Sequence, residues 1–169
     1  MGADKGSLVY ASSGVDQRTH CAALLTLHCD EVFVSCRPDQ VPALTPGLRP
    51  ILDAPDLGGL GPSAGLLSAH RHAPGAAWLV LAVDFPHVTV DGLGALVAAR
   101  APAALGTAYV NDAGILEPLF AIWEPAGLAS LATSGAHSPR RVLEAGPCSH
   151  VRTSERRLLR NVNTPGEFQ

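Results

Sequence analysis

The sequence predicts a three-layer α/β fold with a largely parallel, mixed sheet. Through Asp91, short apolar runs of strand length alternate with segments of helical spacing, which is the pattern of strand–helix–strand units. The longest run, residues 76–86, has no polar residue before Asp84. Such a run is typical of a strand that is covered on both faces in the centre of a parallel sheet. A hairpin pattern between residues 107 and 123 adds the mixed part of the sheet.

Length and composition indicate one domain, residues 1–169, with a sizeable core. The chain is 47% hydrophobic and 16% charged. Its net charge of −3 provides no basic surface for nucleic acid, and no apolar run reaches the roughly 18 residues that a membrane span needs. We therefore expect neither nucleic-acid nor membrane partners. The four cysteines lack C-x-x-C spacing, so we expect reduced thiols and a cytoplasmic protein.

The first third of the chain contains one helix and two short strands. Residues 17–29 are predicted to form an amphipathic helix with Asp16 as its N-cap. Residues 31–36 read as a strand, and residues 50–53 as another that ends in a carboxylate. A glycine-rich turn, residues 58–65, then leads into a helix. Such a turn offers backbone N–H groups to an anion, but a plain surface loop gives the same pattern.

Asp84 ends the long apolar run, and Pro86 then stops the ladder because proline has no N–H to donate. In open parallel sheets, the ligand crevice lies at the carboxyl ends of the strands. A charge buried there without a partner is costly, so we expect Asp84 to face a ligand or a metal ion. The alternative is that Asp84 caps the loop or helix that follows.

The remaining elements follow from turn and cap residues. Pro118 within a strand indicates an edge or a bulge, and proline near a helix start is typical of the first turn. The predicted segments are a helix at 91–100 capped by Asp91, a strand at 107–110, a turn at 111–114, a strand at 116–123, helices from Pro125 and Pro139, a strand at 149–152, and a last helix from Pro165.

Seven short segments occur together in an order that is similar to that of one enzyme family. They are Met1-Gly2-x-Asp4-Lys5, Val34-Ser35-Cys36-Arg37, Leu52-Asp53, Gly61-Pro62-Ser63-Ala64-Gly65, Val83-Asp84-Phe85-Pro86, Glu117-Pro118-Leu119 and Asn161-Val162-Asn163-Thr164-Pro165. Over essentially the whole chain, this set resembles the molybdenum cofactor guanylyltransferases, within the wider family of cofactor and sugar nucleotidyltransferases. The resemblance implies a Rossmann-like nucleotidyltransferase fold.

The resemblance also implies an activity. Members transfer GMP from GTP to the terminal phosphate of molybdopterin carrying molybdenum, release pyrophosphate and need Mg²⁺. GTP and molybdopterin are then the substrates, and proteins of molybdenum cofactor biosynthesis are the expected partners. Two alternatives stay open: another cofactor or sugar-phosphate nucleotidyltransferase that uses CTP, and a catalytically inactive nucleotide-fold protein.

The family roles transfer residue by residue. By resemblance, Lys5 contacts the nucleotide phosphates and Asp84 binds magnesium, and both are catalytic. Asp53 and the segment of Gly61, Pro62 and Gly65 contact the nucleotide. Asn161 and Asn163 match the closing motif on the pterin side of the cleft.

One departure from the family concerns the N-terminal strand. In the family, a buried central strand and the phosphate-binding loop L-A-G-G-x-S-x-R precede the position that Met1 matches, and this sequence lacks both. Without such a strand, its neighbours would expose apolar faces and unpaired ladder groups. Three interpretations follow: the coding region starts further upstream, the chain is an inactive remnant, or a partner or another segment supplies the loop.

Overall fold

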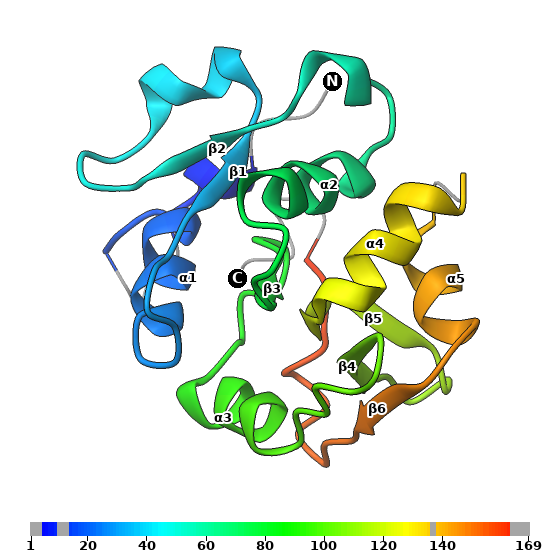
Figure 1. Ribbon diagram of the computed structural model, residues 1–169. Coiled ribbons are helices and arrows are strands. Elements are labelled where there is room, and N and C mark those ends of the chain that lie inside the picture. Colours follow the sequence, from blue (N-terminus) through cyan, green and yellow to red (C-terminus); the bar gives the residue numbers. More distant parts are fainter. Residues whose placement is uncertain (1–4, 10–13, 136–137, 163–169) are drawn as a thin grey trace.

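A computed structural model describes residues 5–9, 14–135 and 138–162 (Figure 1). The strands are β1 (Val34–Cys36), β2 (Pro50–Leu52), β3 (Trp78–Leu81), β4 (Gly106–Val110), β5 (Leu116–Trp123) and β6 (Cys148–Val151). The α-helices are α1 (Gln17–Leu25), α2 (Pro62–His72), α3 (Val90–Ala98), α4 (Pro125–Thr133) and α5 (Pro139–Glu144). Three short 3-10 helices accompany them: η1 (Lys5–Ser7), η2 (Pro38–Ala43) and η3 (Pro55–Leu57).

The described strands form two sheets. β1 and β2 pair in parallel, and four further strands lie in the order β3-β5-β4-β6. β5 is antiparallel to both of its neighbours, whereas β6 is parallel to β4. The mixed α/β class predicted from the sequence is confirmed.

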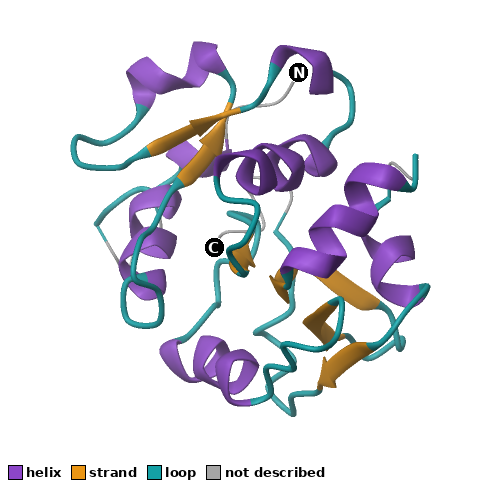
Figure 2. Cartoon of the chain, viewed as in Figure 1, coloured by secondary structure: helices purple, strands orange, loops and turns teal. Residues whose placement is uncertain are grey.

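Helices cover both faces of the four-stranded sheet, which gives the three layers (Figure 2). On one face, Leu25 of α1 and Leu93 and Leu96 of α3 pack in a cluster with Phe120 and Ile122 of β5. On the opposite face, α2, α4 and α5 contribute apolar side chains that pack in a second cluster with Ala121 and Trp123. Successive β5 residues thus point to opposite layers, as the two-residue period of a strand requires.

β3 departs from the sequence prediction in one respect. Leu79 and Leu81 pack on one cluster, and Trp78 and Val80 on the other, so both faces are covered as expected. However, β3 is an edge strand among the described strands, and its ladder with β5 is antiparallel. The prediction of a central strand with parallel pairing is therefore wrong here. An unbroken apolar run reports two covered faces, but it carries no information about strand neighbours.

Local signals gave most helix starts correctly. Asp16 caps α1, accepting a hydrogen bond from the Thr19 backbone N–H at 2.9 Å. α3 is capped instead by Thr89, whose hydroxyl accepts from the Gly92 N–H at 3.1 Å, so the cap predicted at Asp91 is displaced by two residues. α2 begins at Pro62 and includes Gly65, which the sequence had placed in a loop.

The β4–β5 hairpin forms as predicted. Asn111 Oδ1 accepts from the backbone N–H groups of Ala113 and Ile115, both at 3.0 Å, and Gly114 has φ +78°. The pairing then shifts between Ala108 and Tyr109, and this shift places Pro118 in an irregular part of β5. The helix predicted from Pro165 lies outside the described residues.

Two further sequence predictions concern the cysteines and the membrane. All four cysteines are free thiols, as predicted. Within the described part of the chain, no helix has both the length and the apolar character that a membrane crossing requires.

Candidate functional site

A cavity of about 360 Å³ lies between β1 and β3, near the ends of the strands that lead to Asp53 and Val83. Four of the sequence-predicted nucleotide residues line it: Asp53, Gly61, Pro62 and Gly65. The structure thus brings the end of β2 and the start of α2 to one place, although seven residues, 54–60, lie between Asp53 and Gly61 in the chain. This cavity is the candidate functional site.

Asp53 is held by Ser35, and Gly65 makes that contact possible. The Ser35 hydroxyl donates to Asp53 Oδ1 at 3.0 Å, and the Asp53 N–H donates to the Cys36 carbonyl at 3.0 Å. A Cβ at position 65 would lie 2.6 Å from the Ser35 hydroxyl oxygen. Glycine is therefore required here so that α2 can approach β1 without displacing the serine.

Gly61 provides the turn into α2. Its backbone has φ 55° and ψ −134°, a conformation that residues with a Cβ rarely adopt. Pro62 follows at the first helical position, where its missing N–H costs nothing. The two residues fix where α2 begins beside Asp53.

Asp84 lies just beyond the cavity wall. The cavity lining includes Ala82 and Val83 but not Asp84 itself. Its carboxylate is close enough to act on Cys21, which lines the cavity from α1. Burial raises the pKa of the Cys21 thiol to about 12, a hydrogen bond from Gln17 opposes this shift, and the Asp84 charge adds to it.

The closing segment of the chain reaches Asp84. The backbone N–H of Val162 donates to the Asp84 carbonyl at 2.9 Å, and the Val162 side chain is 1% exposed. This bond places Asn161, which is exposed, in the neighbourhood of Asp84. Asn163 lies outside the described residues.

Lys5 opens η1, and its side chain lies outside the described part of the structure. The next residue, Gly6, lies directly against Arg18, since a Cβ at Gly6 would be 2.8 Å from Arg18 Cδ. η1 is therefore positioned beside a residue that lines the cavity.

Sequence reasoning missed Arg18. Arg18 is only 5% exposed and lines the cavity. Its Nη2 donates a hydrogen bond to the Ala43 carbonyl at 3.4 Å. An arginine in a predicted amphipathic helix is normally assigned to the solvated face. Its spacing from Cys21, Ala22 and Leu25 was the available signal, since residues three, four and seven apart share one helix face.

The Asp84 carboxylate is an oxygen ligand of the kind that a magnesium ion prefers. The described residues contain no group of three or more His, Cys, Asp or Glu side chains that could form an all-protein metal cage. Mg²⁺ commonly takes only one or two carboxylates and completes its coordination with water and substrate phosphate oxygens. A single carboxylate beside a cavity matches that habit better than it matches zinc, which favours sulfur and nitrogen.

Solved structures share this fold. A molybdopterin-guanine dinucleotide biosynthesis protein A from Archaeoglobus fulgidus superimposes with a TM-score of 0.74 at 19% identity, covering 99% of this chain and 88% of that one. A 4-diphosphocytidyl-2C-methyl-D-erythritol synthase gives a TM-score of 0.65 at 15% identity, covering 99% and 92%. The predicted Rossmann-like nucleotidyltransferase fold is confirmed.

The family follows from the sequence match. The model of the MobA-like NTP transferase domain matches residues 1–153, and the chain belongs to this family. A molybdenum cofactor biosynthesis bifunctional protein from a Synechocystis strain is 28% identical over 174 residues, covering 99% of this chain and 49% of that protein. The chain thus spans about half the length of this curated relative.

We expect the Cys21 thiol to make stability fall at alkaline pH. Its folded pKa of about 12 exceeds the ordinary 9.0, so the folded state keeps a proton that the unfolded state loses as pH rises above 9. The free energy of unfolding should therefore drop by about 1.4 kcal/mol more between pH 8 and pH 10 than in Cys21→Ala. Urea unfolding at both pH values measures this difference, and equal pH slopes for the two proteins would contradict it.

We expect the effect of Gly65→Ala on the free energy of unfolding to depend on residue 35: destabilising beside Ser35 and stabilising in a Ser35→Ala background. In the natural protein the new Cβ displaces the Ser35 hydroxyl and breaks its bond to Asp53, which should cost about 1 kcal/mol. In a Ser35→Ala background the same change should stabilise, because alanine is the better helix former. Urea unfolding of the four proteins gives the coupling. Gly75→Ala is the control, because a Cβ at position 75 meets no atom within 4 Å and its effect should not depend on residue 35. If the effects of Gly65→Ala and Ser35→Ala simply add, the prediction is wrong.

Proposed function

We propose that this chain is the catalytic domain of a guanylyltransferase that transfers GMP from GTP to molybdopterin, with release of pyrophosphate. One observation carries the proposal: Asp53, the Gly61–Gly65 segment and the Asp84 segment converge at one cavity in a chain of the MobA-like NTP transferase family. The names of two relatives, which refer to molybdenum cofactor and molybdopterin-guanine dinucleotide biosynthesis, support the choice of substrates.

The nucleotide is assigned to the cavity side of α2. Asp53 accepts hydrogen bonds, and Ser35 holds it in place from β1. Gly61, Pro62 and Gly65 at the start of α2 line the same cavity, and the two glycines leave room for a nucleotide because they carry no side chain. Lys5, the single lysine of the sequence, supplies a movable positive charge to the phosphates.

Asp84 is assigned to the metal ion. Bound Mg²⁺ would neutralise charge on the phosphate oxygens. Asp84 provides a hard oxygen ligand, and the Val162 N–H fixes the main chain at that position. Asn161, the exposed residue before Val162, is assigned to the pterin side because it matches the closing motif of the family.

The reaction needs no protein nucleophile. An oxygen of the terminal pterin phosphate attacks the α-phosphorus of GTP and forms a new P–O bond. The bond from that phosphorus to the bridging oxygen breaks, and pyrophosphate leaves with the electron pair. The protein positions the two phosphates and neutralises their charge, which is the main contribution of enzymes to phosphoryl transfer.

A CTP-using enzyme is the second candidate. The observation that favours it is the likeness to the diphosphocytidyl-methylerythritol synthase, whose chain is covered to 92%. Parallel binding measurements with GTP and CTP distinguish the two candidates. At least tenfold tighter binding of GTP supports guanylyl transfer, and the reverse order supports the second candidate.

Asp84→Asn should reduce magnesium-dependent GMP transfer about a hundredfold or more, because the amide is a much weaker Mg²⁺ ligand. Pyrophosphate release in the presence of GTP and molybdopterin measures turnover, and thermal unfolding verifies the fold. Asp91→Asn, an exposed carboxylate in the first turn of α3, is the matched control. Undiminished turnover in Asp84→Asn would remove the metal assignment.

Lys5→Ala should weaken GTP binding about tenfold or more, because a charge-assisted hydrogen bond to phosphate is lost. Guanosine, which has no phosphate, should bind both proteins equally, and Lys5→Arg should retain much of the GTP affinity. Isothermal titration calorimetry provides the three comparisons. If GTP affinity stays the same in Lys5→Ala, the lysine is a solvated terminal residue.

A further inference from the structure

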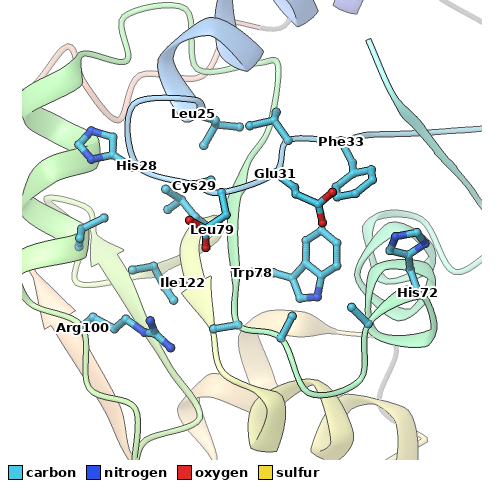
Figure 3. A pocket seen from close by; sticks show the side chains of 16 residues that line it. Leu25, His28, Cys29, Glu31, Phe33, His72, Trp78, Leu79, Arg100 and Ile122 are labelled. Atoms are coloured by element: carbon cyan, nitrogen blue, oxygen red, sulfur yellow. The ribbon is translucent and has the colours of Figure 1, made fainter. Parts of the chain in front are cut away.

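Gln17, the first residue of α1, is a polar side chain in a buried stripe of that helix. It is 0% exposed, and Cys21 and Leu25 continue the stripe, since residues four apart share a helix face. At the far end of the stripe, Leu25 lies with Leu79 at a second cavity, of about 330 Å³ (Figure 3). The near end, at Gln17, lies instead against the segment that carries Asp84.

The carboxamide of Gln17 reaches the turn that follows Asp84. Its Nε2 donates to the Phe85 carbonyl and to Cys21 Sγ, both at 3.4 Å. A carbonyl oxygen only accepts hydrogen bonds, so the amide nitrogen must face Phe85, and this fixes the orientation of the amide. Burial raises the pKa of the Cys21 thiol and the Asp84 charge adds to that shift, so the carboxylate approaches the same sulfur. Gln17, Cys21 and Asp84 therefore form one cluster.

The other polar atom of this amide, Gln17 Oε1, is a buried acceptor. No described residue donates a hydrogen bond to it. Asp84 Oδ1, in the same cluster, is buried as well. A buried acceptor without a donor costs free energy, and native proteins contain few of them. The oxygen of Gln17 therefore calls for a donor that the described residues do not provide.

The two hydrogen bonds of Gln17 do not explain why a glutamine is buried here. The Phe85 carbonyl also accepts from the Val88 N–H at 3.4 Å, so it stays paired without the glutamine. The Cys21 sulfur is only a weak acceptor and needs no donor. An apolar side chain of similar length would fill the space without an unpaired oxygen. Stability alone would therefore favour methionine over glutamine at position 17.

The main chain of Gln17 connects the helix to the segment that begins with Lys5. The Gln17 N–H donates to the Leu8 carbonyl at 2.9 Å, and Val9 pairs with Asp16 in an antiparallel bridge. Lys5 opens η1, which ends directly before Leu8. One residue thus hydrogen-bonds to both segments to which phosphate and metal contacts are assigned.

We propose that Gln17 is a positioning residue for the magnesium ion assigned to Asp84: its Nε2 holds the turn after Asp84, and its Oε1 accepts a hydrogen bond from a water molecule on the ion. This inference rests on the proposed function. Mg²⁺ usually keeps several of its waters, and such waters are donors that need acceptors nearby. The amide oxygen of glutamine is an acceptor only, and partners of this kind around a metal ion commonly determine its affinity.

The contribution of the metal ion to GTP binding tests the inference. Isothermal titration calorimetry gives the GTP affinity with excess Mg²⁺ and with EDTA, and the ratio of the two affinities measures this contribution. No molybdopterin is present, so turnover does not enter. In Gln17→Met we expect the ratio to fall about tenfold or more, with the affinity in EDTA unchanged. The thermal midpoint should stay equal or rise, because the buried unpaired oxygen is gone.

Two matched variants show which property of Gln17 matters. Gln17→Glu keeps an acceptor oxygen on a side chain of the same length and should retain most of the ratio. Thr107→Val removes a different buried hydrogen bond, which the Thr107 hydroxyl accepts from the Ala101 N–H at 3.2 Å. It should lower the thermal midpoint and leave the ratio unchanged. Gln17→Leu provides the same comparison if Gln17→Met does not fold.

The outcomes separate this inference from the proposed function. If Gln17→Met keeps the full ratio while Asp84→Asn lowers it, Gln17 is an ordinary core residue and the metal assignment stands. If Gln17→Glu loses as much of the ratio as Gln17→Met, the acceptor oxygen is not the group that matters, and the inference is wrong. Absence of a magnesium effect in the natural protein, or an unchanged ratio in Asp84→Asn, would remove the metal assignment itself and this inference with it.

Discussion

The pairing of main-chain groups is the constraint on which this structure depends. The main-chain groups on one side of β1 pair with β2, and those on one side of β3 pair with β5. The other side of each strand faces the space between β1 and β3. The helices α1 and α2 pack across that space with one apolar face each. The two sheets, the cavities between them and the position of the candidate site all follow from this arrangement.

The candidate site is built by main-chain geometry more than by charge. Gly61 adopts a backbone conformation that excludes most residues, and Gly65 leaves room for the Ser35 hydroxyl. Gly65 thereby preserves the hydrogen bond from Ser35 to Asp53, and Gly61 starts α2 beside Asp53. The charges at the cavity come from Arg18, which lines it, and from Asp84, which lies just beyond its wall.

Sequence patterns predicted the elements that depend on local chemistry. The Asp16 cap, the Asn111–Gly114 turn and the strand around Pro118 are read from a few adjacent residues, and the structure has each of them. Neighbour relations are different, because they depend on residues far apart in the chain. The edge position of β3 could not be read from the apolar run around Trp78, whereas the helical spacing of Arg18 from Cys21, Ala22 and Leu25 did carry a signal for its inward direction. The convergence of Asp53 and Gly61 was expected from the family resemblance, and the coordinates supply its geometry.

The hydrogen bond from Val162 to the Asp84 carbonyl bears on where this domain ends. The family match stops at residue 153, but the buried Val162 side chain and its N–H belong to the same folded unit as the acid. A shortened protein that stops at the family boundary would leave that carbonyl without this donor and would uncover the surface beneath the valine. Boundaries for expression are therefore better set by the last buried residue than by sequence similarity.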